Sequence, residues 1–221
     1  MASNWSLLHL LLKLFLSNLK HRSRIIMNSL LALKGDGFLA IATDKSKYFY
    51  NIKINNDYDK CYRFGSHIVI CPYGESGFGE EFINLLKSNF SLHELRHGKP
   101  MSLTALANFA KNIMMDRLRS REGMVKSNFL LGGFCTYSQK AMAFSLDPYG
   151  TLIENNALAA GDLKSYFLSL CGLVDDDRLF TKEEVYEIFD KYSKIVNKNY
   201  VAHNGDLRIY VTDKEGTRNI D

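Results

Sequence analysis

The apolar pattern over residues 27–45 consists of two short runs separated by a turn sequence. The runs, Leu30 to Leu33 and Phe38 to Ala42, flank residues 34–37 (KGDG), and Asp44 follows the second run. Apolar runs on either side of a Gly/Asp turn are typical of a β-hairpin. We therefore predict a hairpin over residues 27–45 that ends beside an acid.

Further strands are indicated by alternation or by short apolar runs. Tyr48, Tyr50, Ile52 and Ile54 alternate as the residues of a strand do, and residues 67–71 (HIVIC) form a short apolar run. The same criteria predict strands at residues 128–135, at both ends of 140–154 around a turn at 147–150, and at 207–216 together with a turn.

Helices are predicted where apolar residues recur at helical spacing. The segments are a helix through residues 82–90 that follows a glycine-rich turn at 74–79 and ends at 98–100, and helices over 102–121, 163–173 and 181–196. Ser102 and Thr181 are favourable N-caps, and acids follow Thr181 in the first turn of its helix. The order is strands, two helices, strands, two helices, strand. Grouped strands and helices favour a layered α+β fold, with two sheets between two helical layers and no domain linker.

Composition narrows the class of protein. The 221 residues include 46% hydrophobic and 24% charged residues and carry a net charge of +4 spread along the chain, which gives no support for a nucleic-acid-binding protein. The four cysteines (Cys61, Cys71, Cys135 and Cys171) form no CxxC motif. They favour free thiols in a reducing compartment over zinc or disulfides.

The N-terminal segment is leucine-rich and then basic. Residues 6–24 (SLLHLLLKLFLSNLKHRSR) are too interrupted by polar residues to span a bilayer, and the basic residues follow the apolar run instead of preceding it as in a signal peptide. Three interpretations of this segment are compatible with the sequence. It is a helical leader, a targeting segment, or an addition from a gene model that starts too early, in which case Met27 is the true start.

Other candidate chemistry is weak. The segment 74–79 (GESGFG) lies between a strand and a helix but lacks the Gly-Lys-Ser/Thr ending of a phosphate loop, and 175–177 (DDD) lacks EF-hand spacing. We predict no metal or cofactor site. Asp44 at the end of the hairpin and Lys60 on a following strand would form an ion pair under the start of the first strand, and such a pair would influence a nucleophile placed there. Their spacing alone does not single them out, since a lone Asp and a lone Lys are usually surface residues.

Several segments carry a family resemblance. The hairpin 27–45, DYDKCYRF (57–64), LHELRHGKPMSLTALANF (92–109), LRSR (118–121) and NFLLGGF (128–134) resemble, in that order, the proteasome beta subunits, and most of all the subunit at the fourth beta-ring position. The resemblance covers about residues 27–215. It implies an αββα sandwich of two antiparallel sheets between helical layers, the N-terminal-nucleophile hydrolase fold.

The resemblance also implies the roles of the site residues. Active members expose an N-terminal threonine whose own amine is the base, supported by an Asp and a Lys, with backbone N–H groups of a Gly-rich turn for the oxyanion. Asp44 and Lys60 match that Asp and Lys, whereas Asn28 occupies the nucleophile position. No threonine precedes Thr43, and neither Ser23 nor Ser29 follows a glycine. AAGDLKSYF (159–167) also lacks the Ser-Gly-rich turn of active members.

The resemblance, together with the missing threonine, implies a non-catalytic beta subunit of the 20S core particle that takes part in ATP- and ubiquitin-dependent protein degradation. Residues 1–26 would be a leader or extension and 27–221 the beta-type domain. The expected partners are neighbouring beta subunits, the alpha ring and the opposite beta ring, with neither nucleic acid nor membrane, in cytoplasm and nucleus. The alternatives are an autonomous N-terminal-nucleophile amidase that uses Ser29 or another unmasked residue, and a leader-targeted organellar or secreted protein.

Overall fold

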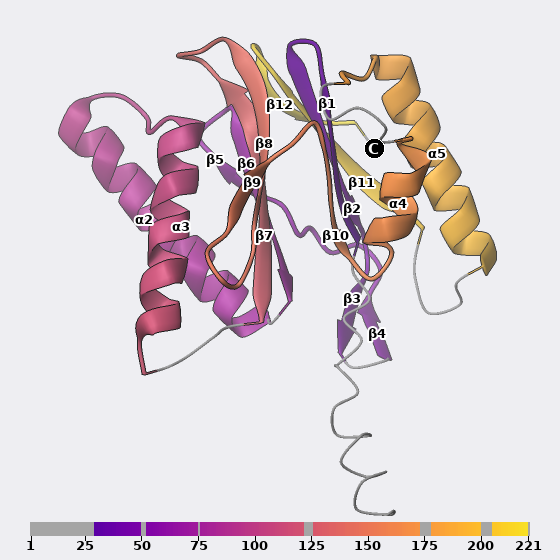
Figure 1. Ribbon diagram of the computed structural model, residues 1–221, viewed down its shortest axis with the longest axis horizontal. Coiled ribbons are helices and arrows are strands. Elements are labelled where there is room, and N and C mark those ends of the chain that lie inside the picture. The colour runs from indigo at the N-terminus through magenta and orange to yellow at the C-terminus, as the bar shows by residue number, and fades with distance from the viewer. Residues whose placement is uncertain are drawn as a thin grey trace, which may run out of the picture.

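The computed structural model describes residues 29–49, 52–74, 76–121, 126–172, 178–199 and 205–220 (Figure 1). In these residues two five-stranded antiparallel sheets face each other, and helices cover the outer face of each sheet. This is the four-layer αββα sandwich that the element order and the family resemblance predicted. The layers follow from the sequence because each sheet has two apolar faces, both of which must be covered.

The first sheet contains the predicted hairpin at its centre. Its strands lie in the order β10-β1-β2-β11-β12. Their bounds are β1 Ser29–Gly35, β2 Phe38–Asp44, β10 Ala157–Gly161, β11 Leu207–Asp213 and β12 Gly216–Asn219. Strand β2 pairs with β1 on one side and with β11 on the other, so that Asp44 lies opposite Leu207.

The second sheet is a meander in which each strand pairs with the next along the chain. Its order is β5-β6-β7-β8-β9. Their bounds are β5 Tyr62–Phe64, β6 Ile68–Gly74, β7 Ser127–Cys135, β8 Lys140–Leu146 and β9 Leu152–Glu154. Gly132 of β7 faces the hairpin, since a Cβ atom there would lie 2.3 Å from the Leu39 side chain.

Two helices cover each sheet. Helices α2 (Ser76–His97) and α3 (Leu103–Arg119) lie on the second sheet, and α4 (Lys164–Leu170) and α5 (Lys182–Asn199) on the first (Figure 1). Helix α2 begins earlier than predicted and includes Gly77 and Gly79, because the turn is completed at Gly74, whose φ is +122°. Within the described residues, none of the helices combines the length and apolar character needed to cross a membrane.

The apolar residues form three layers of core. One cluster lies between α2–α3 and the second sheet, one between α4–α5 and the first sheet, and one between the two sheets. The outer clusters are rich in aromatic side chains, whereas the middle cluster contains mainly aliphatic and small ones, including Ala32, Ala141 and Ala143. Along β1 the side chains alternate between clusters: Leu30 faces the other sheet and Leu31 faces the helices.

The strand predicted from the alternation of Tyr48 to Ile54 is wrong as a single strand. The chain instead forms a two-stranded ribbon of β3 (Lys47–Phe49) and β4 (Ile52–Asn55), which lies at the end of the first sheet (Figure 1). Every residue of β4 is exposed, including Ile52 at 69% and Ile54 at 61%. Alternation alone predicts a strand but cannot show where the chain reverses. Tyr50 lies outside the described residues.

The predicted cap of the last helix is present as a reciprocal pair of hydrogen bonds. The Glu184 backbone N–H donates to Thr181 Oγ1 (3.2 Å), and the Thr181 backbone N–H donates to Glu184 Oε2 (2.9 Å). Replacing Thr181 by alanine is expected to lower the free energy of unfolding by about 1 kcal/mol, since the helix loses one side-chain acceptor. Urea denaturation of the full chain measures it. Thr181→Ser, which keeps the hydroxyl, should lose clearly less.

The same cap makes stability depend on pH. The hydrogen bond from the Thr181 backbone N–H, followed by that from Arg178, lowers the pKa of Glu184 from its usual 4.5. Because the folded pKa is depressed, this contribution is present above pH 4.5 and is lost as pH falls through the folded pKa. Glu184→Gln should therefore flatten the unfolding free energy against pH in the acid range. An unchanged acid slope would contradict the prediction.

Candidate functional site

Asp44 is placed by the end of the central hairpin. It is the last residue of β2, it is 2% exposed, and its Oδ1 accepts a hydrogen bond from the Ser29 backbone N–H at 2.8 Å. A further backbone hydrogen bond comes from Ser46. The carboxylate therefore joins the start of β1 to the end of β2, and the prediction of a buried acid at the end of the hairpin is confirmed.

Lys60 completes the pair that the sequence suggested. Its Nζ lies 2.6 Å from Asp44 Oδ2, and the residue is 6% exposed. The expected ion pair is thus present. The prediction that Lys60 lies on a strand is wrong. Lys60 belongs to the irregular segment 56–61 between β4 and β5.

Contacts with β11 hold this segment in place. Arg208 forms an ion pair with Asp57, and its Nη1 lies 3.9 Å from Asp59 Oδ2. Tyr210 donates a hydrogen bond to the same Asp59 oxygen at 2.5 Å. Because these partners are about 150 residues away in sequence, the position of Lys60 depends on the fold as a whole and not on a local motif.

Burial dominates the electrostatics of the pair. Desolvation raises the pKa of Asp44, although the positive charge of Lys60 and the hydrogen bonds oppose this increase. Desolvation likewise lowers the pKa of Lys60, against the attraction of Asp44. Two such groups without each other would be costly to bury. The arrangement can polarise a group at the start of β1, and it also fastens the 56–61 segment to the hairpin.

Of the residues considered for the nucleophile (Ser23, Asn28 and Ser29), only Ser29 lies within the described residues. Its Oγ is 2.6 Å from the Tyr192 hydroxyl of α5, and the residue is 4% exposed. Its side chain therefore lies on the helical side of the first sheet. Asn28, which the family resemblance places at the nucleophile position, lies outside the described residues.

Comparison with known families and relatives completes these observations. The family model described as "Proteasome subunit" matches residues 27–212, which include the hairpin, Asp44 and Lys60. The chain belongs to the proteasome subunit family.

Relatives within this family are of the beta type. The chain is 30% identical over 191 residues to "Proteasome subunit beta type-2" of Trypanosoma brucei brucei, covering 83% of this chain and 92% of the relative. It is 30% identical over 200 residues to "Proteasome subunit beta type-2-B" of Arabidopsis thaliana (87% and 94%). A "Probable proteasome subunit beta type-4" of Schizosaccharomyces pombe is 28% identical over 200 residues (88% and 99%). The proteasome beta-type assignment from the sequence is confirmed.

The remaining sequence candidates do not join the Asp44–Lys60 pair in this proteasome subunit. Gly77 and Gly79 of the glycine-rich segment lie within α2, where a Cβ at Gly79 would be 3.2 Å from the Pro72 side chain. Gly79 therefore allows close packing of helix and strand, whereas a Cβ at Gly77 would meet no atom within 4 Å. The acidic run 175–177 lies outside the described residues. The 159–167 segment forms the end of strand β10 and the start of α4.

One motif was missed from the sequence. Residues 93–97 (HELRH) have the His-Glu-x-x-His spacing of zinc hydrolases, and the rings of His93 and His97 lie 4.5 Å apart on α2. A catalytic zinc site of this kind needs a third protein ligand. Among the described residues, no group of three or more His, Cys, Asp or Glu side chains is arranged to hold a metal ion.

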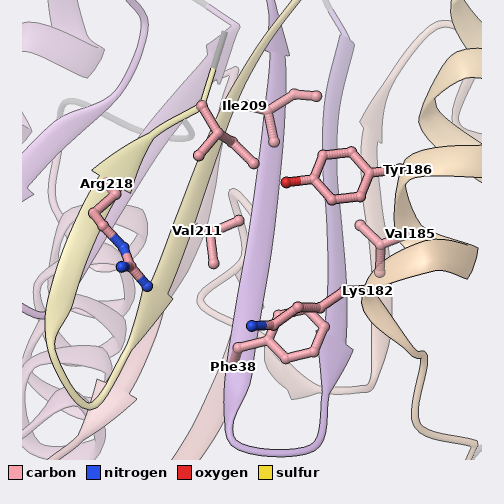
Figure 2. Close-up of a pocket in the computed structure, with 8 residues that line it drawn as sticks. Phe38, Lys182, Val185, Tyr186, Ile209, Val211 and Arg218 are labelled. Carbon is pink, nitrogen blue, oxygen red and sulfur yellow. The ribbon is translucent and has the colours of Figure 1, made fainter.

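A small pocket lies elsewhere on the first sheet (Figure 2). It has a volume of about 190 Å³ and lies between α5 and strands β11 and β12. Its lining residues are Phe38, Lys182, Val185, Tyr186, Ile209, Val211, Arg218 and Ile220. Phe38 and Asp44 are at opposite ends of β2, roughly 20 Å apart at the rise of a strand. The pocket is therefore separate from the Asp44–Lys60 pair.

Proposed function

We propose that this chain is a non-catalytic structural beta subunit of the 20S proteasome core particle. Its role is to occupy one position of the beta ring and to form part of the wall of the chamber in which other subunits cleave peptides, within ATP- and ubiquitin-dependent protein degradation. The observation that carries this proposal is a complete supporting pair without a threonine. Asp44 and Lys60 are paired beside the start of β1, while the position two residues before Leu30 is asparagine.

The chemistry of the site supports the absence of catalysis. An N-terminal nucleophile needs a hydroxyl or thiol and a free amine on the same residue. Asn28 has an amide side chain, and the sequence contains no threonine before Thr43. The Asp44–Lys60 pair then has a structural role, because it joins the hairpin to the 56–61 segment in the interior of the domain.

Exposed apolar side chains support assembly into a larger particle. They lie on the β3–β4 ribbon, at Ile52 and Ile54, and on α2, where Leu95 is 84% exposed. Exposed apolar side chains that lie together, as Ile52 and Ile54 do on one short strand, are typical of surfaces that bind a partner. We propose as partners the two neighbouring beta subunits, the alpha ring and the opposite beta ring.

The rival function is an autonomous amidase with Ser29 as nucleophile. Two contacts weigh against it: the Ser29 hydroxyl lies against Tyr192 on the helical side of the sheet, and the Ser29 backbone N–H is already donated to Asp44. A serine nucleophile must instead direct its hydroxyl toward a substrate, with its amine free to accept a proton.

Purification of the tagged full chain from its native cells tests assembly. The expected result is co-purification, in one large particle, with alpha subunits and other beta subunits. The intact mass of the subunit in that particle also gives its mature N-terminus and the fate of residues 1–26. A monodisperse monomer without such partners would overturn the proposal.

Labelling with an electrophilic proteasome inhibitor tests the absence of catalysis separately. We expect adducts on other beta subunits of the same particle and an unmodified mass for this chain. A covalent adduct on this chain, with a new N-terminus at Ser29, would establish the amidase instead. We propose that the chain is located in cytoplasm and nucleus. Imaging of a reporter fused to the first 30 residues tests this location. Entry of the reporter into an organelle or the secretory pathway would contradict it.

A further inference from the structure

Two cysteine thiols lie against each other next to the Asp44–Lys60 pair. Cys61 Sγ and Cys71 Sγ are 2.8 Å apart, while both residues are free cysteines. This separation exceeds the ~2.0 Å of a disulfide bond but leaves no room for another atom between the sulfurs. Cys61 follows Lys60 directly, and its sulfur also lies 4.0 Å from Thr43 Oγ1, next to Asp44.

The strand register explains why the two thiols meet. Strands β5 and β6 pair Tyr62 with Ile70, so the next residues outward, Cys61 and Cys71, are directly opposite each other. Directly opposite residues of antiparallel strands have Cβ atoms about 4.5–5.5 Å apart, and the Cβ atoms of a disulfide are about 3.5–4.5 Å apart. A bond between the two sulfurs therefore needs only a small local adjustment of the backbone.

The two cysteines differ in burial, which gives them different roles. Cys61 is partly exposed, whereas Cys71 is fully buried in the core between the sheets. Burial raises the pKa of the Cys71 thiol well above its ordinary value. Cys61 is therefore the residue that a dissolved oxidant reaches first, and Cys71 is the thiol that then reacts with the oxidised Cys61.

We propose that Cys61 and Cys71 are a redox-modification site that forms a reversible disulfide with a peroxide-class oxidant. The Cys61 thiolate attacks one peroxide oxygen, the O–O bond breaks, and the products are a Cys61 sulfenic acid and hydroxide. Cys71 sulfur then attacks the Cys61 sulfur; the S–S bond forms, the S–O bond breaks and water leaves. Overall, two thiols lose two electrons and two protons, and one peroxide becomes two waters.

The location of this disulfide gives it a structural effect. It would covalently join the end of the 56–61 segment, which carries Lys60, to the central part of β6. Oxidation would then fix the position of Lys60 against Asp44. This inference does not depend on the proposed function, because it requires only the two thiols and their register.

Mass spectrometry of the full chain, in the complex with which it is purified, tests the inference. The complex is treated with hydrogen peroxide, alkylated in denaturant and digested with trypsin without reduction. Cleavage after Lys60, Arg63 and Lys87 places the two cysteines on separate peptides, 61–63 and 64–87. We expect these peptides to appear as one linked species that lacks two hydrogen atoms, and to separate on treatment with dithiothreitol.

The chain provides its own controls. Cys135 and Cys171 are also buried free cysteines, and neither has a contact with another thiol among the described residues. Burial raises the pKa of the Cys171 thiol to about 12, so its alkylation should be unchanged by peroxide, while alkylation of Cys61 and Cys71 is lost in equal amounts. Cys61→Ser should abolish the linked species and leave Cys71 alkylated. In Cys71→Ala, peroxide should oxidise Cys61 further, to sulfinic or sulfonic acid, because no second thiol reacts with its sulfenic acid.

Three results would overturn the inference. In the first, Cys61 and Cys71 stay fully alkylated at a peroxide dose that oxidises added dithiothreitol. In the second, wild-type Cys61 is oxidised to a sulfinic acid with no linked peptide. In the third, the linked species contains Cys135 or Cys171. Because all three are measured on the wild-type chain, a variant that fails to fold does not affect the test.

Discussion

Replacing Lys60 by methionine is expected to lower the free energy of unfolding by about 3–5 kcal/mol at neutral pH. The variant retains most of the side-chain volume but leaves the Asp44 carboxylate, which is 2% exposed, without its only cationic partner within 4 Å among the described residues. The Ser29 and Ser46 backbone N–H groups remain as donors, but they do not neutralise a buried charge. Urea denaturation of the full chain measures the loss.

The dependence of this loss on pH follows from the sign of the Asp44 shift. Its folded pKa is raised above 3.8 by burial, and removal of Lys60 removes a contribution that lowers it. At pH values between the two pKa values the folded state then binds more protons at Asp44 than the unfolded state does. The contribution of Asp44 to stability is therefore greatest below pH 3.8 and decreases as pH rises through the folded pKa. The variant should therefore regain part of its lost stability on acidification.

Two controls separate the buried charge from other effects. The double variant Asp44→Leu with Lys60→Met removes both charges and should be closer to the wild type than Lys60→Met alone. Lys194→Met breaks an exposed pair with Asp190 and should change stability by less than about 1 kcal/mol. The prediction is wrong if Lys60→Met and Lys194→Met have equal effects.

Replacing Phe129 by alanine is expected to destabilise the chain by a similar amount, about 3–5 kcal/mol. Phe129 of β7 is fully buried, and its ring centroid lies 4.4 Å from that of Phe82 and 6.4 Å from that of Phe78, both on α2. The substitution leaves a cavity between the second sheet and its helical layer. The same urea denaturation measures it.

Phe129→Leu is the matched control, because it retains most of the apolar volume and should lose clearly less. Equal losses for Phe129→Ala and Phe129→Leu would show that the aromatic contacts, and not the cavity, determine the effect. A loss below about 1 kcal/mol for Phe129→Ala would contradict the description of this cluster as a tightly packed core.

The sequence predicts the parts of this fold in which the signal is local. The hairpin, the Ser102 and Thr181 caps and the layer order all depend on neighbouring residues, and each is present. The bounds of α2 were less predictable, since Gly77 and Gly79 suggested a loop. At Gly79 the lack of a side chain is used instead for close packing against Pro72 of β6, and only the position of the neighbouring strand reveals this.

The site shows the same limit. Asp44 was predicted as buried from its place after an apolar run, and the family resemblance identified Lys60. The contacts that position Lys60 come from Arg208 and Tyr210, whose relation to the 56–61 segment no local pattern indicates. The approach of Cys61 to Cys71 likewise depends on the register of β5 and β6, and register is set by pairing and not by spacing along the chain.

The side chains of β1 alternate between two cores, and this alternation fixes the register of the hairpin that carries Asp44. Leu30 and Leu31 point to opposite cores, so a slip of the hairpin by one residue would exchange both sets of side chains and bury each on the wrong side. Asp44 is locked at the end of β2 by this constraint, whether or not a substrate is ever cleaved beside it. An intact acid and lysine are therefore evidence of a correctly folded sandwich and do not by themselves indicate catalysis.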